Sequence, residues 1–154
     1  MEIIVCGDNH GLITPLEKIL ETYPNADAYI HCGDVELDPS YVDKFHVVTG
    51  NNDYYYDFPQ ELIVEVEDVK ILVTHGHQFY GDRVSKLASR AINHHCQIAC
   101  YGHTHIYNEV YEKGVLCLNP GSLRYNRDGS NPCFARITRD ETGFVIERID
   151  VKSL

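Results

Sequence analysis

Two histidines spaced two residues apart are the feature of the chain that points most directly to chemistry. His103 and His105 stand in the segment from Cys100 to His105, directly after a short apolar run. In an extended chain, side chains at positions i and i+2 lie on the same face, so the two imidazoles can enter one site. Small residues beside them, Gly102 and Thr104, leave room for an ion. The same spacing also occurs in ordinary loops, so its meaning depends on what the rest of the chain supplies.

Other side chains able to bind a metal follow further predicted strands. Apolar and β-branched runs at 2–6, 26–32, 46–49 and 69–73 predict buried strands, and polar residues come after each. With the two histidines, the donors that follow the five strand ends are Asp8, His10, Asp34, Asn51, His75, His103 and His105. In open α/β sheets, ligands bind beyond the carboxyl ends of the strands. We therefore expect these seven donors to converge at one edge.

The donor set predicts a pair of divalent metal ions. Seven oxygen and imidazole donors exceed the three or four that one tetrahedral zinc takes. They suit two ions about 3.5–4 Å apart that share a bridging carboxylate. Mixed nitrogen and oxygen donors favour Mn, Fe, Zn, Ni or Co over Ca or Mg, and we expect Mn²⁺ first among them. Only Asp8 and Asp34 are anionic, so the loaded site keeps positive charge and attracts a phosphate ester.

Composition restricts the partners and the compartment. The formal net charge is −10, from 13 basic and 23 acidic residues, which argues against a stable complex with nucleic acid. The N-terminus has no basic segment followed by an apolar one, and no apolar run approaches the ~20 residues of a membrane span. Six cysteines occur without a C-x-x-C pair and favour reduced thiols. We expect a cytoplasmic protein with no membrane contact.

The order of predicted elements indicates an α/β fold. Strand, helix and strand alternate at the start, with a helix over about 12–23, which favours parallel pairing. The segments 62–66 and 69–73 then predict a hairpin, 82–95 predicts a helix, and the remainder reads as strands. We expect a mostly parallel first sheet, a more antiparallel second sheet and helices on the outer faces. The length corresponds to a single domain, residues 1–154.

The ordered motifs resemble those of a known enzyme family. They are Asp8-x-His10, Gly33-Asp34, Gly50-Asn51-x-Asp53, Thr74-His75-Gly76-His77, Gly102-His103-x-His105 and Asn119-Pro120-Gly121-Ser122. Over roughly residues 3–125, the chain resembles the calcineurin-like metallophosphoesterases, specifically their small single-domain bacterial and archaeal phosphodiesterases. The resemblance implies two mixed β-sheets packed face to face as a sandwich flanked by helices, in four αββα layers.

The resemblance also implies a role for each donor. By that likeness, the first ion would be held by Asp8, His10 and His105, and the second by Asn51, His75 and His103. Asp34 would bridge the ions. A hydroxide between the ions, its pKa lowered by both, would attack phosphorus in line. Asp34, Asn51 and His77 would serve the catalytic step.

One departure from the family concerns the leaving group. Many members have a histidine where Asn52 stands in this chain, and that histidine is thought to protonate the leaving oxygen. Here either another acid serves, with His77 and Asp53 the nearest in the motifs, or good leaving groups need none.

A second departure concerns the substrate. Family members that act on phosphoproteins or dinucleoside polyphosphates carry Gly-Asp-x-x-Asp-Arg-Gly, whereas Gly33-Asp34 continues here as Val35-Glu36-Leu37. The missing arginine favours hydrolysis of a small phosphodiester, with nucleotides among the candidates. A small-molecule phosphomonoesterase would share every metal ligand and is the alternative. A non-catalytic scaffold, as in a retromer subunit of this fold, is disfavoured because all seven ligands are intact.

Several other residues allow two interpretations. The run 54–56 is three tyrosines, which could stack on a nucleobase or pack against a second copy in a homo-oligomer. Arg124 and Arg127 could reach the substrate or lie on the surface. His31 lies within an apolar run, and we expect it to be a hydrogen-bonded core residue. The hydroxyl of Ser122 is expected to bind loop backbone rather than to act as a nucleophile.

Overall fold

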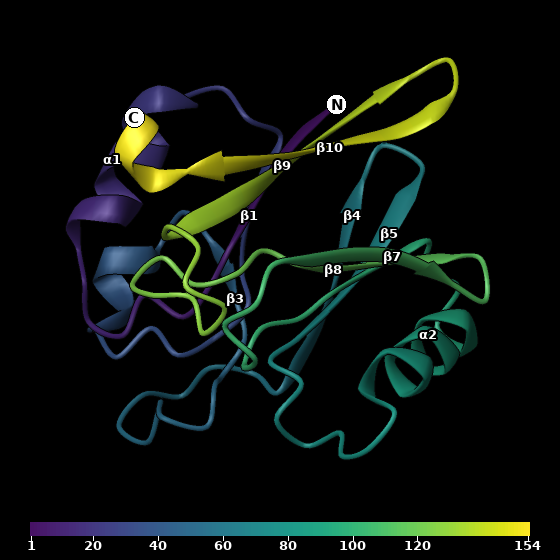
Figure 1. Ribbon diagram of the computed structural model, residues 1–154, viewed down its shortest axis with the longest axis horizontal. Helices are drawn as coiled ribbons and strands as arrows, with labels where there is room; N and C mark the ends of the chain where they lie inside the picture. The colour runs from purple at the N-terminus through teal and green to yellow at the C-terminus, as the bar shows by residue number, and fades with distance from the viewer.

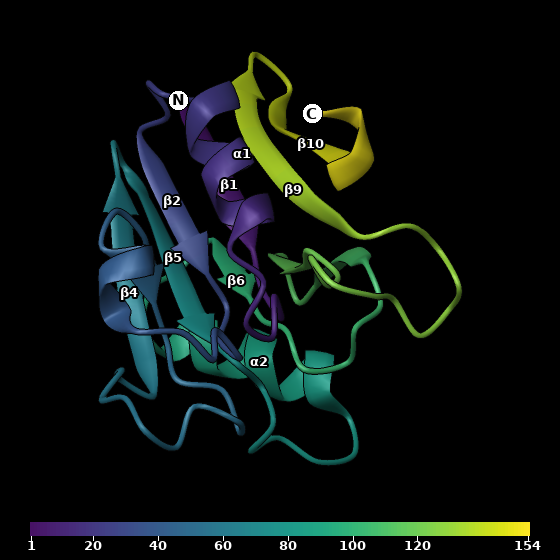
Figure 2. The same ribbon diagram turned by 90° about the vertical axis from the view of Figure 1, so that its left-hand side faces the viewer.

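The computed structural model describes residues 1–154 and contains ten strands and two α-helices (Figures 1 and 2). In chain order the elements are β1 (Glu2–Cys6), α1 (Thr14–Thr22), β2 (Ala28–His31), β3 (His46–Val47), β4 (Glu61–Val66), β5 (Val69–Thr74), α2 (Arg83–Asn93), β6 (Ile98–Cys100), β7 (Asn108–Glu112), β8 (Val115–Asn119), β9 (Cys133–Asp140) and β10 (Gly143–Asp150). Two short 3₁₀ turns, η1 (Pro39–Val42) and η2 (Val151–Ser153), complete the chain. Neither α-helix is long and apolar enough to cross a membrane.

The strands form two mixed five-stranded sheets, as expected. Their orders are β10-β9-β1-β2-β3 and β4-β5-β6-β8-β7. In the first sheet β1, β2 and β3 are parallel, and in the second β5, β6 and β8 are parallel. The expected contrast between a mostly parallel and a more antiparallel sheet is wrong, because β9 returns to pair with β1 and brings β10 with it. An alternating apolar pattern predicts a strand but carries no information on its partner.

The two sheets pack face to face, and a helix covers each outer face. Ile3 and Val5 of β1 point into the core between the sheets, while Ile4 and Cys6 point outward to α1. This alternation explains why β1 is a continuous apolar run that is buried on both faces. On the other sheet, Ala88 and Ala91 of α2 pack against a similar outer face. Figure 1 shows α1 and α2 on opposite sides of the sandwich.

The predicted elements lie within a few residues of their observed bounds. The hairpin of β4 and β5 turns at Glu67 and Asp68 with direct antiparallel pairing on both sides. The second helix begins one residue after Asp82, whose carboxylate accepts the backbone N–H of Ser85. All six cysteines are buried and carry free thiols. The result is a frame in which the parallel strands of both sheets end on the same side.

Candidate metal centre

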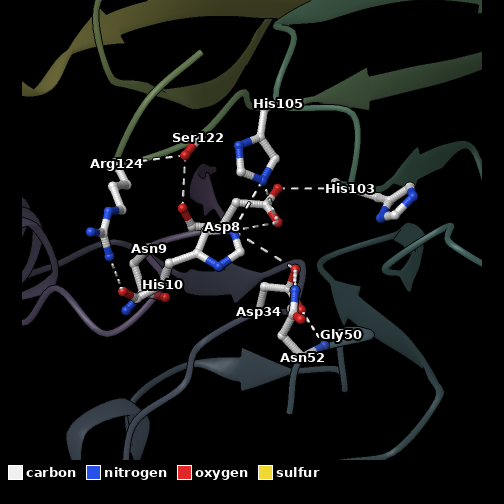
Figure 3. A network of polar contacts seen from close by, with 12 residues as sticks. Asp8, Asn9, His10, Asp34, Gly50, Asn52, His103, His105, Ser122 and Arg124 are labelled. Carbon is white, nitrogen blue, oxygen red and sulfur yellow. Dashed lines mark hydrogen bonds and ion pairs between the residues drawn. The ribbon is translucent and has the colours of Figure 1, made fainter. Parts of the chain in front are cut away.

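The seven predicted donors come together where the parallel strands of both sheets end. Each follows the carboxyl end of β1, β2, β3, β5 or β6, so the site lies across the junction of the two sheets. Figure 3 shows the side chains that follow β1 and β2 facing those that follow β6. The contacts that link the set join Asp8, His10, Asp34, Asn51, His75, His103 and His105.

The first group of donors consists of Asp8, His10 and His105. The Oδ1 atom of Asp8 lies 3.8 Å from Nε2 of His10 and 3.5 Å from Nε2 of His105. The two Nε2 atoms are themselves 3.0 Å apart. One atom from each of the three residues can therefore face a single ion.

The second group lies beside the first. His75 Nε2 is 3.4 Å from Oδ2 of Asp34 and 3.0 Å from Oδ1 of Asn51. The same amide oxygen lies 3.2 Å from Nδ1 of His103. Asp34 Oδ2 is also 3.8 Å from Nε2 of His10, so this carboxylate stands between the two groups.

The geometry fits metal ions because one carboxylate oxygen within the donor set, Asp8 Oδ1, has no hydrogen-bond partner. Asp8 Oδ1 is fully buried and accepts no hydrogen bond, although Oδ2 accepts the backbone N–H of His103 at 3.1 Å. An unpaired buried carboxylate oxygen is costly unless a cation compensates it. Imidazole nitrogen and carboxylate oxygen are also the ligands that Mn, Fe, Zn, Ni and Co accept. The chemistry of the donor set and the unpaired oxygen of Asp8 both fit bound cations.

The outward-facing nitrogens of three histidines are held by oxygen atoms. His75 Nδ1 donates to the carbonyl of Cys32 at 2.7 Å, and His105 Nδ1 donates to that of Tyr125 at 3.2 Å. Nδ1 of His10 faces Oε1 of Glu36 at 3.4 Å. In the neutral form of each ring, these contacts favour the proton on Nδ1, so that Nε2 carries a lone pair directed inward and is able to bind a metal. Such outer contacts fix the tautomer of metal ligands and orient the ring.

The backbone of the site is unusual. Nine non-glycine residues have positive φ, and six of them belong to the site loops: Asp8, His10, Asp34, Glu36, His103 and His105. Left-handed backbone is unfavourable for residues with a Cβ and persists where the surrounding structure imposes it. Two glycines make room for the carboxylates. A Cβ at Gly50 would lie 2.1 Å from Oδ1 of Asp34, and one at Gly102 would lie 2.8 Å from Oδ2 of Asp8.

Burial and nearby charge act against each other on Asp34 and His75. Burial alone would raise the pKa of Asp34. Without a bound ion, however, the hydrogen bond and charge of a protonated His75, together with hydrogen bonds from Asn52, hold the pKa well below its usual range. Burial alone would lower the pKa of His75, but the carboxylates of Asp34 and Asp8 raise it overall. The two carboxylates therefore stabilise positive charge at this position.

His77 lies beside the second group rather than within it. Its ring centroid is 5.3 Å from that of His75 and 6.2 Å from that of His103. Burial lowers the pKa of His77, and the positive charges of His75 and Arg83 lower it further. Its Nδ1 atom is buried and has no hydrogen-bond partner.

Asn52 and Asp53 have different structural roles. The backbone N–H and side-chain amide of Asn52 donate to the two oxygens of Asp34 at 2.9 and 3.0 Å. Asp53 is buried and accepts three backbone N–H groups, those of Asp34, Glu36 and Gly50, at 2.8–2.9 Å. A carboxylate bound in this way shapes the loops, so Asp53 is not placed to act as the leaving-group acid.

Ser122 has the structural role that we expected. Its hydroxyl donates to the carbonyl of Asp8 at 2.7 Å and accepts the backbone N–H groups of Arg124 and Tyr125. Arg124 in turn donates from Nη1 to the carbonyl of His10 at 2.8 Å (Figure 3). The Asn119-Pro120-Gly121-Ser122 loop therefore supports the loop that follows β1.

The buried histidine in β2 joins the loops that follow β1 and β2. His31 is fully buried and accepts the backbone N–H of Gly33 on Nδ1 at 3.1 Å. Its Nε2 therefore donates to Oδ1 of Asn9 at 2.8 Å. The Asn9 amide donates to the carbonyls of Leu12 and Val35, both at 3.0 Å. Burial lowers the pKa of His31 to about 4, so this residue is neutral. The expected core histidine is confirmed.

Two residues of the site were missed by sequence reasoning. Glu36 reaches His10, and Arg83 donates from Nε to the carbonyl of Gly76 at 3.0 Å. The charge of Arg83 also lowers the pKa of His103, after the larger effects of burial and His75. Neither residue belongs to a recognisable spacing pattern, because each reaches the site through loop geometry. A positive side chain in the first turn of α2 gave no signal of its own.

Comparisons with known proteins agree with this geometry. Residues 1–142 match the family model of the calcineurin-like phosphoesterase superfamily domain. The chain is 34% identical over 155 residues to the probable metallophosphoesterase YsnB of Bacillus subtilis, covering 97% of this chain and 91% of the relative. A crystal structure of a predicted phosphoesterase from Streptococcus pneumoniae superposes with a TM-score of 0.91 at 33% identity, covering 98% of this chain and 90% of that one.

A more distant structural neighbour has a similar fold. Vps29 of Entamoeba histolytica, crystallised in complex with Zn²⁺, gives a TM-score of 0.76 at 23% identity and covers 98% of this chain and 99% of its own. At this identity the likeness concerns the fold alone.

Proposed function

The chain belongs to the calcineurin-like phosphoesterase superfamily and is a metal-dependent phosphoesterase, and from this premise we propose that it hydrolyses small phosphodiesters at a centre of two divalent ions. The observation that carries the proposal is the position of Asp34 Oδ2, 3.8 Å from His10 Nε2 and 3.4 Å from His75 Nε2. One carboxylate between two separate donor groups is the arrangement of a bridging ligand.

The residues that would hold the ions follow from the two groups. The first ion would be held by Asp8, His10 and His105, the second by Asn51, His75 and His103, and both by Asp34. When bound, two divalent ions lower the pKa of a water molecule between them and neutralise charge on the phosphoryl group. Mn²⁺ is the expected occupant, with Fe, Zn, Ni and Co as alternatives.

The chain's own side chains would complete the reaction. Asn52 donates hydrogen bonds to both oxygens of Asp34 and so orients this carboxylate. Because the side-chain amide of Asn52 is used in this contact, it cannot take over the role of the histidine that stands at this position in many relatives. His77, whose ring lies beside those of His75 and His103, would give a proton to the leaving oxygen. Arg83, fixed through Nε on Gly76, adds positive charge beside His77 and would attract an anionic substrate.

Residues 1–154 would act as one domain. A single apolar cluster contains residues of both sheets, among them Ile3, Ile30, Ile71 and Leu118. Because the donors come from both sheets as well, separating the sheets would destroy the core and the centre together.

The test compares two chromogenic substrates and counts metals. Protein stripped by a chelator is assayed with bis(p-nitrophenyl) phosphate and p-nitrophenyl phosphate, before and after addition of Mn²⁺. We expect Mn²⁺ to restore turnover with preference for the diester, and elemental analysis to find two ions per chain. Preference for the monoester would replace the phosphodiesterase by the phosphatase alternative.

Two ligand variants sharpen the metal count. His105→Ala removes a ligand of the first group, and His75→Ala one of the second. We expect each variant to lose one ion preferentially. Full loading of both variants would contradict the two-ion assignment, and no turnover with Mn²⁺, Ni²⁺, Co²⁺ or Zn²⁺ would favour a scaffold.

A further inference from the structure

A cavity of about 330 Å³ opens directly beside the candidate metal centre. Its lining consists of Glu36, Asn52, Asp53 and the tyrosines of 54–56. Resting on the proposed function, we propose that this cavity binds the nucleobase of a nucleotide phosphodiester whose phosphate lies at the metal centre.

Two lining residues connect the cavity to the centre. Asn52 donates its side-chain amide to Asp34 at 3.0 Å, and Glu36 approaches His10 at 3.4 Å. The cavity therefore begins one side chain away from two of the donors. A substituent on a phosphate bound at the centre would therefore lie near this cavity.

The charge of the lining selects which part of a substrate enters. Two of the six lining residues, Glu36 and Asp53, are acidic, and none is basic. A second phosphate group would be repelled there. Asp53 is committed to three backbone N–H groups, whereas Glu36 is exposed and can accept hydrogen bonds from amino groups of a base. The lining suits an uncharged group that donates hydrogen bonds.

The tyrosines supply aromatic faces. Tyr54 and Tyr55 are 77% and 89% exposed, and their rings stand at 90° with centroids 6.5 Å apart. Tyr56 contacts Phe58, which packs on the core of the first sheet. One ring of the run is thus anchored, and two present open faces next to the cavity. Aromatic faces can stack on any of the nucleobases, because every base has a π-face.

The volume is compatible with one nucleoside. Small-molecule sites in proteins span roughly 300–1,000 Å³, and this cavity is at the lower end. A single base with its ribose can occupy such a space, while a long polynucleotide would extend over a surface that carries net negative charge.

The first test uses two diesters with the same leaving group. Adenosine 5′-(p-nitrophenyl phosphate) and methyl p-nitrophenyl phosphate both release p-nitrophenolate, so a difference in kcat/KM reports the nucleoside alone. With the Mn²⁺-loaded protein we expect a preference of about tenfold for the adenosine ester. In the double variant Tyr54→Leu/Tyr55→Leu, that ratio should fall towards one. Tyr111→Leu, at an exposed tyrosine on β7 outside the cavity, is the matched control and should keep the ratio.

The second test measures binding without catalysis. Adenosine is titrated into the chelator-stripped protein and followed by NMR. We expect saturable binding that weakens about tenfold in the double variant and stays unchanged in Tyr111→Leu. Gel filtration of each variant shows whether its oligomeric state is preserved.

The outcomes separate this inference from the proposed function. If the methyl ester is hydrolysed but the ratio is near one, the cavity inference is overturned and the phosphodiesterase remains. If neither ester is hydrolysed with any metal, the proposed function fails, and adenosine binding alone decides whether the cavity takes a base. An altered oligomeric state in the double variant, with no loss of adenosine binding, would assign the tyrosines to a contact between copies and overturn the inference.

Discussion

The two ends of the sandwich carry charged residues in opposite environments. At the metal edge, where the parallel strands end, Asp8 and His75 are fully buried and Asp34 is 2% exposed. At the hairpin edge, the turns of β4–β5, β7–β8 and β9–β10 lie where the parallel strands begin. There Arg139 pairs with Glu67 and Asp68, which are 52% and 78% exposed.

The difference separates stability from activity. Exposed ion pairs contribute about 0–1 kcal/mol, so the hairpin edge can vary at little cost. Buried carboxylates without a partner are destabilising until a cation compensates them. The metal edge therefore contains residues that the fold alone would disfavour, and changes at the two ends should affect different measurements.

The largest effect is expected for Asp8→Asn. Loss of this charge should lower kcat/KM by about 10³-fold or more, because the ions would lose an anionic ligand. In the metal-free protein the same change should raise the free energy of unfolding by about 1 kcal/mol. The reason is that Asp8 Oδ1 has no hydrogen-bond partner, whereas the amide nitrogen of the introduced asparagine could donate to a neighbouring histidine Nε2. Turnover assays and urea denaturation check both parts.

A matched control for Asp8→Asn lies at the hairpin edge. Asp68→Asn makes the same chemical change at an exposed site and should leave turnover unaltered. If Asp8→Asn destabilised the metal-free protein, the claim that the metal edge contains residues unfavourable to folding would be wrong.

The next effect is the acid sensitivity caused by His31. Burial lowers its pKa to about 4 in the folded protein, compared with about 6.5 when unfolded. Because the folded value is lower, the unfolded chain binds the proton more strongly, and stability falls as the pH drops from about 6.5 to 4. The loss should reach about 3 kcal/mol. Urea denaturation of metal-free protein across this pH range measures it.

His31→Asn provides the control for this pH dependence. Asparagine keeps an acceptor for the N–H of Gly33 but cannot titrate in this range. The variant should be less stable at pH 7 and should show a shallower loss of stability towards pH 4. Equal slopes for the two proteins would remove His31 as the cause.

The next effect, a loss of catalytic rate, is expected for His77→Ala. With a diester whose leaving group is an alkyl alcohol, removal of a proton donor should lower kcat about 100-fold. Hydrolysis of p-nitrophenyl esters, whose leaving group needs no acid, should change little, and elemental analysis should still find both ions. His46→Ala removes an exposed histidine of β3 and should have no effect. Loss of an ion from His77→Ala would instead make His77 a metal ligand.

The smallest effect is expected at the hairpin edge. Arg139→Gln removes two exposed ion pairs, and the free energy of unfolding should change by less than about 1 kcal/mol. The Tm should shift by no more than about 4 °C, and turnover should remain at the wild-type level. A large loss of turnover would mean that the two edges are coupled.

The sequence predicts the centre well because the donors occupy defined positions relative to strands. A strand of apolar residues has a direction, and parallel strands bring their carboxyl ends together. Residues directly after such strands, such as Asp34 and His75, are therefore brought close by the fold itself. The spacing of His103 and His105 adds a second, local signal.

Other features depend on three-dimensional loop paths. Glu36 contacts His10 from a loop in which its own backbone has a positive φ of 54°, and no pattern of residue types reveals that loop path. Arg83 lies near His77 only because α2 begins beside the loop that follows β5. The pairing of β9 with β1 connects segments more than 100 residues apart, and alternation of apolar residues does not identify that partner.

The left-handed backbone of the donors has a consequence for how such a protein changes over generations. Glycine adopts positive φ without the cost that His10 or His103 incurs, about 1 kcal/mol or more for each residue. A lineage released from selection for catalysis would therefore gain stability by replacing these histidines. We expect His103→Gly to raise the Tm of the metal-free protein. A lower Tm would refute the idea that replacing these histidines stabilises the fold. Loss of the metal ligands is then favoured by the stability of the folded chain. A complete donor set persists only while catalytic activity is under selection.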